Sequence, residues 1–340
     1  SLHDLQAVDR RIFEYWAHAM AFLPMTDYRF YMPRMERHRI SKRAWLSDWK
    51  QEHRHVLDEV LERIRVEGAL TSKDFEPPPG TVRGTWWNWK PAKQALEILF
   101  WQGDLMISER KKFQKVYDLT ERVLPSGTNT TRPSKTELGR FHVQRALGGL
   151  GVARAKEIRD AFHVVDQAHI DASLKEMQQS KEVVALSIEG LDDVYYALAE
   201  TLERDASPRP DSAHILSPFD NLTIQRDRME RLFDFKYTIE CYLPEGKRQY
   251  GYFVLPILWR DQLIGRLDAK ADRKAANLIV KKLWFESEFT AFADALPALA
   301  DALAQFALFN SCRTVELDAI VPTGHKRRLK SLLKHAMKKR

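Results

Sequence analysis

Residues 51–75 read QEHRHVLDEVLERIRVEGALTSKDF, and their pattern is the first indication of the fold. Its first part repeats apolar residues at helical spacing on one face: Val56, Val60, Leu61 and Ile64. Gly68 is well placed to end that helix. The string Thr71-Ser-Lys-Asp74 then resembles a capping box and starts a short second helix through Phe75.

Residues 91–119, PAKQALEILFWQGDLMISERKKFQKVYDL, complete the unit. Pro91 suits the first turn of a helix with an apolar stripe formed by Ala92, Ala95, Leu96, Leu99 and Phe100. Two strands, Leu105–Glu109 and Phe113–Leu119, then flank a basic tip at Arg110–Lys112. Helix, short helix, helix and two-stranded wing is the order of a winged helix, whose third helix enters the major groove of DNA.

The same order recurs downstream. Ser134-Lys-Thr-Glu137 is a capping box for a helix that we expect to reach Leu147 and to stop at Gly148-Gly149. Further helices and strands follow in the same order: helices over Val152–Phe162 and Asp166–Gln179, and strands over Val183–Ile188 and Asp192–Ala197. This second wing is acidic, which favours a structural winged helix over one that reads DNA.

Beyond Pro208 the pattern changes to strands joined by tight turns: Lys236–Leu243, Gln249–Trp259, Gln262–Lys270 and Asn277–Trp284. They predict an antiparallel meander curled into a small barrel or sandwich. A helical stretch, Glu286–Phe309, and a strand near Thr314–Leu317 complete this domain. At the other end of the chain, Arg11 to Pro33 holds aromatic strands without preceding helices, as expected for the end of a domain.

We therefore predict an α+β protein in which tandem winged-helix domains pack on an antiparallel β-domain. The predicted divisions are 1–45, a remnant of a first winged helix; 46–130, a winged helix with a basic wing; 131–207, a further winged-helix-like domain; 208–322, a β-rich domain with one long helix; and 323–340, a basic tail.

The charge is unevenly distributed. The 340 residues hold 54 Lys and Arg against 47 Asp and Glu, but eight of the basic residues lie in 326–340, so the remainder is balanced. Local clusters therefore matter more than the sum. Six basic residues and one acid, Glu36, fall within Arg29–Arg43, and another basic cluster spans Arg110–Lys115. Residues 189–205 are acidic and are expected to point away from a polyanion.

Composition excludes several classes of protein. With 44% hydrophobic residues the chain can build real cores, and Cys241 and Cys312 alone cannot form a disulfide framework or a zinc site. The most apolar stretch, Ala291–Phe309, is interrupted by two Asp and one Pro, so no membrane span is predicted. We expect a cytoplasmic, nucleoid-associated monomer without cofactor or metal.

Several strings carry a family resemblance: Phe13-Glu-Tyr-Trp-Ala-His18 with Phe22-Leu-Pro24, Trp86-Trp-Asn-Trp-Lys-Pro91, Glu109-Arg-Lys-Lys-Phe-Gln-Lys-Val-Tyr-Asp-Leu-Thr120, Leu216-Ser-Pro-Phe-Asp220, Leu232-Phe-Asp-Phe235, Lys247-Arg-Gln-Tyr-Gly-Tyr-Phe-Val-Leu-Pro256 and Gly265-Arg-Leu-Asp-Ala-Lys270. With these strings the sequence resembles the AlkZ/YcaQ family of winged-helix DNA glycosylases. The resemblance implies binding of double-stranded DNA, excision of N-alkylated purines and, for some members, unhooking of interstrand crosslinks.

One departure concerns the catalytic motif. The family carries Gln–aliphatic–Asp or Gln–aliphatic–Gln upstream of the Phe-Glu-Tyr-Trp string, but only twelve residues precede Phe13 here. Gln6-Ala-Val-Asp9 has the wrong spacing, and neither Gln102-Gly-Asp104 nor Gln225-Arg-Asp227 has an aliphatic middle residue. We therefore expect this chain to lack its principal catalytic residues.

Excision of an alkylated purine requires few catalytic groups. An alkylated N7 makes the purine cationic and a good leaving group, so one carboxylate or carboxamide suffices to stabilise the oxocarbenium-like sugar and position water. Candidates are Glu14 and His18, nearest the expected motif, and Asp220, for which a loop-fixing role is favoured.

Basic side chains are the candidates for DNA binding: Lys93, Arg110, Lys111, Lys112, Lys115, Lys247 and Arg248, the last two in an expected hairpin between strands. Trp86, Trp87 and Trp89 could stack on bases, although packing explains them better. Two other functions stay open: a non-enzymatic winged-helix regulator, which would need a dimerisation element, and a repair scaffold without activity.

Overall fold

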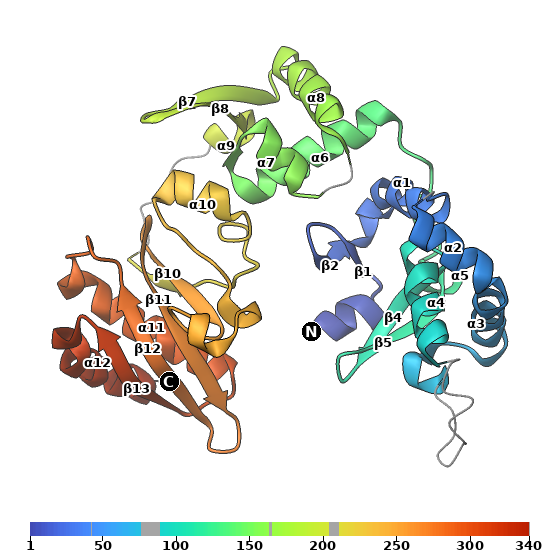
Figure 1. Cartoon of the computed structure of the whole chain (residues 1–340). Helices are drawn as coiled ribbons and strands as arrows, with labels where there is room; N and C mark the ends of the chain where they lie inside the picture. Colours follow the sequence, from blue (N-terminus) through green and yellow to red (C-terminus); the bar gives the residue numbers. More distant parts are fainter. Residues whose placement is uncertain (42, 76–88, 163–164, 204–210, 340) are drawn as a thin grey trace. The chain divides into compact units, whose positions relative to one another are not determined.

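The computed structural model describes residues 1–41, 43–75, 89–162, 165–203 and 211–339 (Figure 1). They form a mixed α+β protein with antiparallel sheets. The chain divides into two compact units, Ser1–Leu202 (unit 1) and Glu203–Arg340 (unit 2). Unit 1 contains a first region, residues 1–123, and a second region, residues 135–202.

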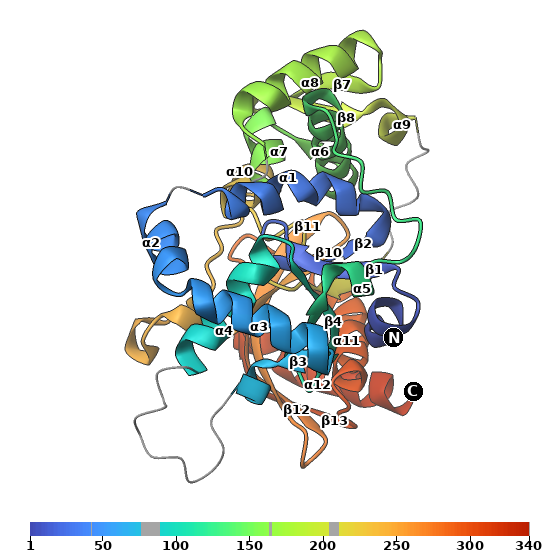
Figure 2. The same cartoon turned by 90° about the vertical axis from the view of Figure 1, so that its right-hand side faces the viewer.

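The first region runs through η1 (Asp4–Val8), β1 (Ile12–Trp16), β2 (Met20–Pro24), η2 (Met25–Asp27), α1 (Tyr28–Arg39), α2 (Ala44–Glu52), α3 (Arg54–Glu67), β3 (Leu70–Thr71), η3 (Ser72–Phe75), α4 (Trp89–Trp101), β4 (Leu105–Lys111), β5 (Gln114–Leu119) and α5 (Thr120–Val123). Strands β3, β5 and β4 form one sheet in that order, and β1 and β2 form an antiparallel pair. Helices α3 and α4 pack side by side next to the β4–β5 hairpin (Figure 2).

The aromatic segment at the start of the chain lies in the same core as the helices that follow. Phe13 and Tyr15 of β1 are fully buried, and Tyr15 packs edge-to-face on Phe100 of α4 with 5.5 Å between ring centroids. The Tyr15 hydroxyl donates to the Trp101 carbonyl. The predicted strands therefore exist, and residues on both sides of the predicted division at 45 share one hydrophobic core. The finer domain divisions stay predictions.

The predicted signals around α3 and α4 are confirmed. Asp74 accepts hydrogen bonds from the Thr71 backbone N–H and hydroxyl at 2.6 and 2.8 Å, and the whole apolar stripe of α4 is buried. The hairpin turn consists of Lys112 and Phe113, whose φ angles are 49° and 67°. Phe113 was expected within a strand and instead lies in this turn, 89% exposed.

The second region repeats the topology: α6 (Lys135–Leu150), β6 (Val152–Ala153), α7 (Ala155–Asp160), α8 (Gln167–Gln179), β7 (Val183–Ile188), β8 (Leu191–Leu198) and α9 (Ala199–Leu202). Its sheet order, β6-β8-β7, matches β3-β5-β4 of the first region. Two expectations were wrong. Helix α6 continues through Gly148-Gly149 and ends at Gly151, whose φ is 74°, and the helix expected from Val152 begins with a short strand.

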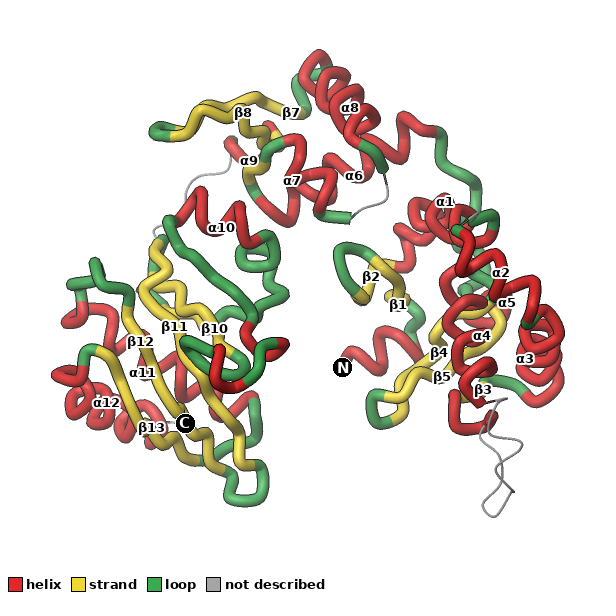
Figure 3. Tube along the Cα trace, viewed as in Figure 1, coloured by secondary structure: helices red, strands yellow, loops and turns green. Residues whose placement is uncertain are grey.

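Unit 2 contains β9 (Ala213–Ile215), α10 (Arg226–Phe233), η5 (Glu240–Tyr242), η6 (Glu245–Lys247), β10 (Val254–Trp259), β11 (Gln262–Asp272), β12 (Asn277–Phe285), α11 (Phe292–Phe309), β13 (Thr314–Val321), η7 (Thr323–His325) and α12 (Lys326–Lys338). The sheet has the open order β13-β12-β11-β10-β9 (Figure 3). Because this single sheet is open at both edges, it is neither a barrel nor a sandwich. Its edge strand β13 follows helix α11 and pairs parallel to β12.

Residues 236–243 are not a strand, contrary to expectation. The Glu240 carboxylate accepts backbone N–H bonds from Gln249, Tyr250 and Gly251 at 2.8–3.1 Å. These groups therefore bond to a side chain and cannot form a strand ladder. As a result β10 begins only at Val254.

The basic tail folds onto unit 2. Leu329, Leu333 and Ala336 of α12 are buried in the same core as α11. The sequence analysis set residues 323–340 apart as a basic tail, whereas α12 shares the core of unit 2. By length and composition alone α11 could cross a membrane, a property shared by core helices, and 39% of it is buried in unit 2.

Candidate active site and nucleic acid interface

A buried carboxylate lies beside the β4–β5 hairpin, close to its turn. Glu14 of β1 is 3% exposed. Its Oε1 accepts from Gln6 Nε2 at 3.0 Å, and its two oxygens accept from Arg110 Nε at 2.9 and 3.0 Å and from Nη2 at 2.5 Å. Gln6 also donates to the Ile107 carbonyl at 3.2 Å. Three chain segments thus converge on one carboxylate.

Local structure explains this convergence. In β1 the flanking residues Phe13 and Tyr15 face the hydrophobic core, so strand alternation turns Glu14 to the other face. That face is covered by η1, which brings Gln6, and by β4, which brings Arg110. The hydrogen bonds from Arg110 hold the carboxylate in place, and they raise the pKa of Arg110 above its usual value.

The carboxylate borders a cavity of about 500 Å³. The wall of this Glu14 cavity includes Gln6, Glu14 and Arg110 together with Lys112 and Phe113 from the hairpin turn. A carboxylate, a carboxamide and two cations therefore face one space beside the exposed basic tip of the first hairpin. In this set the carboxylate can stabilise a developing positive charge and the carboxamide can position a water molecule.

His18 and Asp220 are placed differently. His18 Nδ1 lies 2.9 Å from the Asp160 carbonyl oxygen and ties the β1–β2 turn to the end of α7. Asp220 is exposed and accepts from the Leu222 backbone N–H at 2.9 Å, as a loop-fixing carboxylate does. Neither side chain lines the Glu14 cavity, so of the three candidates only Glu14 combines burial with access to a cavity.

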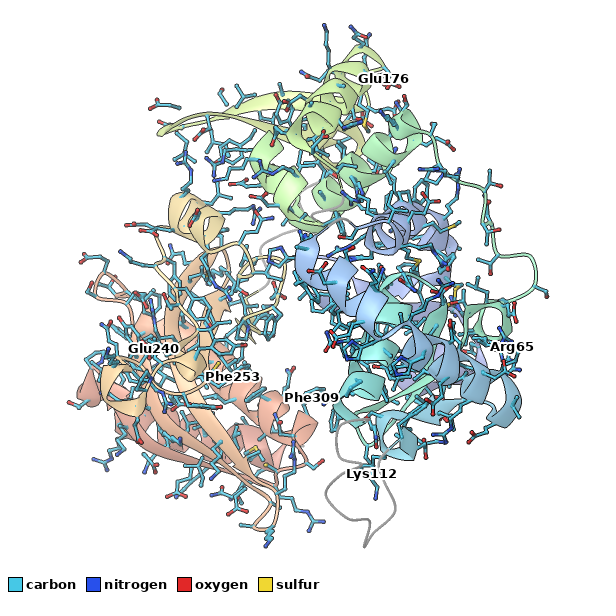
Figure 4. The ribbon with its side chains drawn as sticks, turned by 45° about the vertical axis from the view of Figure 1, so that its right-hand side comes forward. Arg65, Lys112, Glu176, Glu240, Phe253 and Phe309 are labelled. Atoms are coloured by element: carbon cyan, nitrogen blue, oxygen red, sulfur yellow. The ribbon has the colours of Figure 1, made fainter. Side chains whose placement is uncertain are left out.

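The predicted basic residues of the wing separate into two groups. Lys111 and Lys112 are exposed at the tip, where Figure 4 labels Lys112, although Lys111 also pairs with Glu109 at 3.2 Å. Arg110 holds Glu14, and Lys115 pairs with Glu97 at 2.8 Å. The tip thus presents Lys111 and Lys112 to solvent, whereas Arg110 and Lys115 are engaged within the fold.

The other predicted DNA contacts are spread over both units. Lys93 is exposed on α4. Lys247 ends η6, and Arg248 follows it, donating from Nε to the Leu243 carbonyl at 2.9 Å. The two do not lie in a hairpin between strands, because residues 236–253 form turns and loops organised by Glu240. Trp86 and Trp87 lie outside the described residues, as does the side chain of Trp89.

Sequence reasoning missed Gln6. It was set aside because its spacing to Asp9 does not fit the family motif, yet its partners are Glu14 and the Ile107 carbonyl. A glutamine within an otherwise helical turn close to an aromatic strand was the only available signal. Within the described residues no group of three or more His, Cys, Asp or Glu is arranged to hold a metal.

An α+β protein with a basic hairpin tip bordering an enclosed carboxylate has the features expected of a protein that acts on nucleic acid. The family model for AlkZ-like DNA glycosylases matches residues 1–309, and the chain belongs to that family. Its structure is similar to the DNA glycosylase AlkZ of Streptomyces sahachiroi, with a TM-score of 0.60 and 14% sequence identity. The match covers 93% of this chain and 84% of that one and shows a common fold.

Proposed function

We propose that this chain hydrolyses the N-glycosidic bond of N-alkylated purines in double-stranded DNA, and that crosslinks made by bifunctional alkylators are among its substrates. The observation that carries the proposal is the buried Glu14 carboxylate, held by Gln6 and Arg110 beside a cavity at the wing. Membership of a DNA glycosylase family supports it. The action on DNA takes place in the cytoplasm, on the nucleoid of a prokaryote.

The proposed chemistry follows from the alkylated base. When the bond between the sugar and the base breaks, the base leaves with the electron pair and its positive charge is neutralised. The sugar then carries the developing positive charge, which the Glu14 carboxylate stabilises from inside the cavity. Water adds to the sugar carbon and loses its proton to the solvent, while the Gln6 carboxamide donates a hydrogen bond that holds the carboxylate in place.

We further propose that the first and second regions of unit 1 are both winged helices. Lys111 and Lys112 contact DNA phosphates, and Lys93 faces the same DNA from α4. This assignment rests on the repeated order of helices and strands and on the basic tip of the first hairpin. Lys247 and Arg248 remain proposed contacts from unit 2. The proposed active form is a monomer, with no cofactor.

The test is release of 7-methylguanine from a methylated duplex under single-turnover conditions, followed by chromatography. The wild-type chain should release the base, and Glu14→Gln should lower the rate roughly 100-fold, the usual scale for losing one electrostatic contact to a transition state. Equal melting temperatures of the two proteins would show that the carboxylate, and not folding, accounts for the loss.

Glu157→Gln is the matched control. Glu157 is also a buried carboxylate held by an arginine, with Arg154 Nε 2.8 Å from its Oε1, but it lines none of the cavities described. It should leave the rate within about twofold. Absence of any release by the wild-type chain would contradict the proposal. The chain would then be a DNA binder or scaffold.

A further inference from the structure

A second cavity in unit 1 is lined by part of the basic cluster Arg29–Arg43, which does not contribute to the proposed active site. It has a volume of about 660 Å³ and lies between β1, α1, α2 and the end of α4. Three tryptophans and three arginines form most of its wall: Trp16, Trp45, Trp101, Arg34, Arg37 and Arg43. None of these residues lines the Glu14 cavity. We refer to it as the Trp–Arg cavity.

Ion pairs divide the Arg29–Arg43 cluster between the cavity and its surroundings. Arg29 pairs with Glu137 at 3.0 Å and Arg39 with Asp104 at 2.8 Å, so these two cations are neutralised elsewhere. Glu36, the single acid of the cluster, pairs with Arg132 at 2.9 Å. No carboxylate is among the described residues that line the cavity. The described wall of the cavity is therefore cationic, and Arg34 also donates hydrogen bonds to the Trp16 and Ala17 carbonyls.

The pKa of His38, which also lines the cavity, reflects this positive charge. Burial is the main cause that lowers its pKa to about 4, and the cations Arg34, Arg37, Arg43 and Lys50 lower it further. The imidazole is consequently neutral at physiological pH. A site where four cations act on one histidine favours an anionic ligand.

The tryptophans point to a flat aromatic ligand. Trp45 is 52% exposed, an unusual position for the largest apolar side chain, and a ligand would cover it. Trp101 contributes an indole N–H that is buried and has no hydrogen-bond partner among the described residues. Indole faces stack on nucleobases of any sequence, and arginines bind phosphates. The volume falls within the range of small-molecule sites.

We propose that the Trp–Arg cavity binds an unpaired nucleotide, its base against the tryptophans and its phosphate against Arg37 and Arg43. Bases inside an intact duplex are stacked on one another and offer no free face, so the ligand must be unpaired. The assignment to a nucleotide of a DNA strand, and not to a free mononucleotide, rests on the proposed function. The cavity itself is separate from the proposed catalytic carboxylate.

The test measures quenching of tryptophan fluorescence by an unmodified single-stranded octamer, with the matching duplex, dAMP and inorganic phosphate as the other probes. The octamer should bind best. Trp45→Ala should weaken its binding about tenfold, because a base stacked on one aromatic side chain contributes to binding on that scale. Arg37→Ala should weaken it as well and reduce the salt dependence by roughly 0.7 in the log–log slope. Trp45 and Arg37 are exposed, so neither change should unfold the protein.

Arg39→Ala is the matched control, because Arg39 lies on the same helix but pairs with Asp104 outside the cavity. It should leave octamer affinity within twofold. Unchanged octamer binding by Trp45→Ala, or inorganic phosphate competing as well as dAMP, would overturn the nucleotide assignment. Binding of dAMP as tight as the octamer would overturn the DNA source. No alkylated base is present, so the result is independent of the glycosylase assay.

Discussion

The two helix–hairpin regions of unit 1 share a topology but differ in what they carry. The shared part has three helical elements, α3, η3 and α4 in the first region and α6, α7 and α8 in the second. It also has a three-stranded sheet, ordered β3-β5-β4 in the first region and β6-β8-β7 in the second. The first hairpin ends in Lys111 and Lys112, whereas the second ends near Glu189 and Asp192. The same scaffold is therefore cationic at one tip and anionic at the other, so topology alone does not determine which region meets DNA.

The buried carboxylates of the two regions show the same contrast. In the second region Arg154 and Glu157 are three residues apart, and the pair helps to begin α7. In the first region Arg110 and Glu14 are 96 residues apart, and their contact adjoins a cavity. A local pair needs only a helix end, whereas a long-range pair requires the whole region to be folded. A buried ion pair therefore suggests function only when it also adjoins a cavity.

Charge reversal at the two hairpin tips tests this difference most directly. Lys111→Glu with Lys112→Glu should weaken binding to an unmodified duplex roughly 100-fold at low salt, and it should reduce the log–log salt slope by about 2, because two phosphate contacts are lost. Fluorescence anisotropy at several salt concentrations measures both quantities.

The corresponding change in the second region is Glu189→Lys with Asp192→Lys. It should leave duplex affinity unchanged or strengthen it slightly, since that tip is expected to face away from DNA. Equal losses from both double variants, or a salt slope that the first one leaves unaltered, would show that the two wings do not differ in function.

A second test concerns the pH dependence of stability, at a buried histidine of the second region. His142 of α6 is 1% exposed, and neither ring nitrogen has a hydrogen-bond partner among the described residues. Burial, assisted by Arg37 and Arg34, lowers its pKa from 6.5 to about 4. The unfolded chain therefore binds a proton first as the pH falls below 6.5. Stability is lost from there towards pH 4, by about 2 kcal/mol at pH 5.

Replacing His142 with Phe should remove this loss. The ring already lies between Phe141 and Phe162, so an aromatic substitute fits the surroundings. Urea denaturation at pH 7 and pH 5 should show a smaller difference in the variant than in the wild type. His55→Gln, an exposed position on α3, should keep the wild-type difference. Retention of the full pH dependence by His142→Phe would exclude His142 as its source.

Local signals predicted much of the fold. The apolar stripe of α4 and the capping residues Thr71 and Asp74 lie where the sequence indicated, because each depends on neighbours a few residues away. The tip of the first hairpin was predicted to within two residues. Phe113 was wrongly predicted to lie in a strand, because the pattern of apolar residues does not show which residue of a tight turn takes a positive φ.

The candidate site was predicted only in part, because its contacts are long-range. Glu14 was identified from the family strings, but nothing in the sequence links Gln6 to it or assigns Arg110 to the carboxylate instead of to DNA. The local pattern also favours a strand at 236–243. The Glu240 carboxylate instead binds the backbone N–H groups of 249–251, which such a strand would need as partners. Side-chain competition for backbone groups is not visible in periodicity.

The smallest expected effect concerns the helix that opens the second region. Helix α6 passes through Gly148, whose φ is negative and whose added Cβ would meet no atom within 4 Å. Gly148→Ala should therefore raise the free energy of unfolding by about 0.4–1 kcal/mol through a less flexible unfolded chain.

Gly139 of the same helix differs, because a Cβ there would lie 2.1 Å from the Ser173 hydroxyl oxygen and 3.4 Å from the His169 carbonyl. Gly139→Ala should lower stability by about 1 kcal/mol. Urea denaturation measures both changes, and a destabilised Gly148→Ala would mean that α6 ends at this glycine, as the sequence predicts.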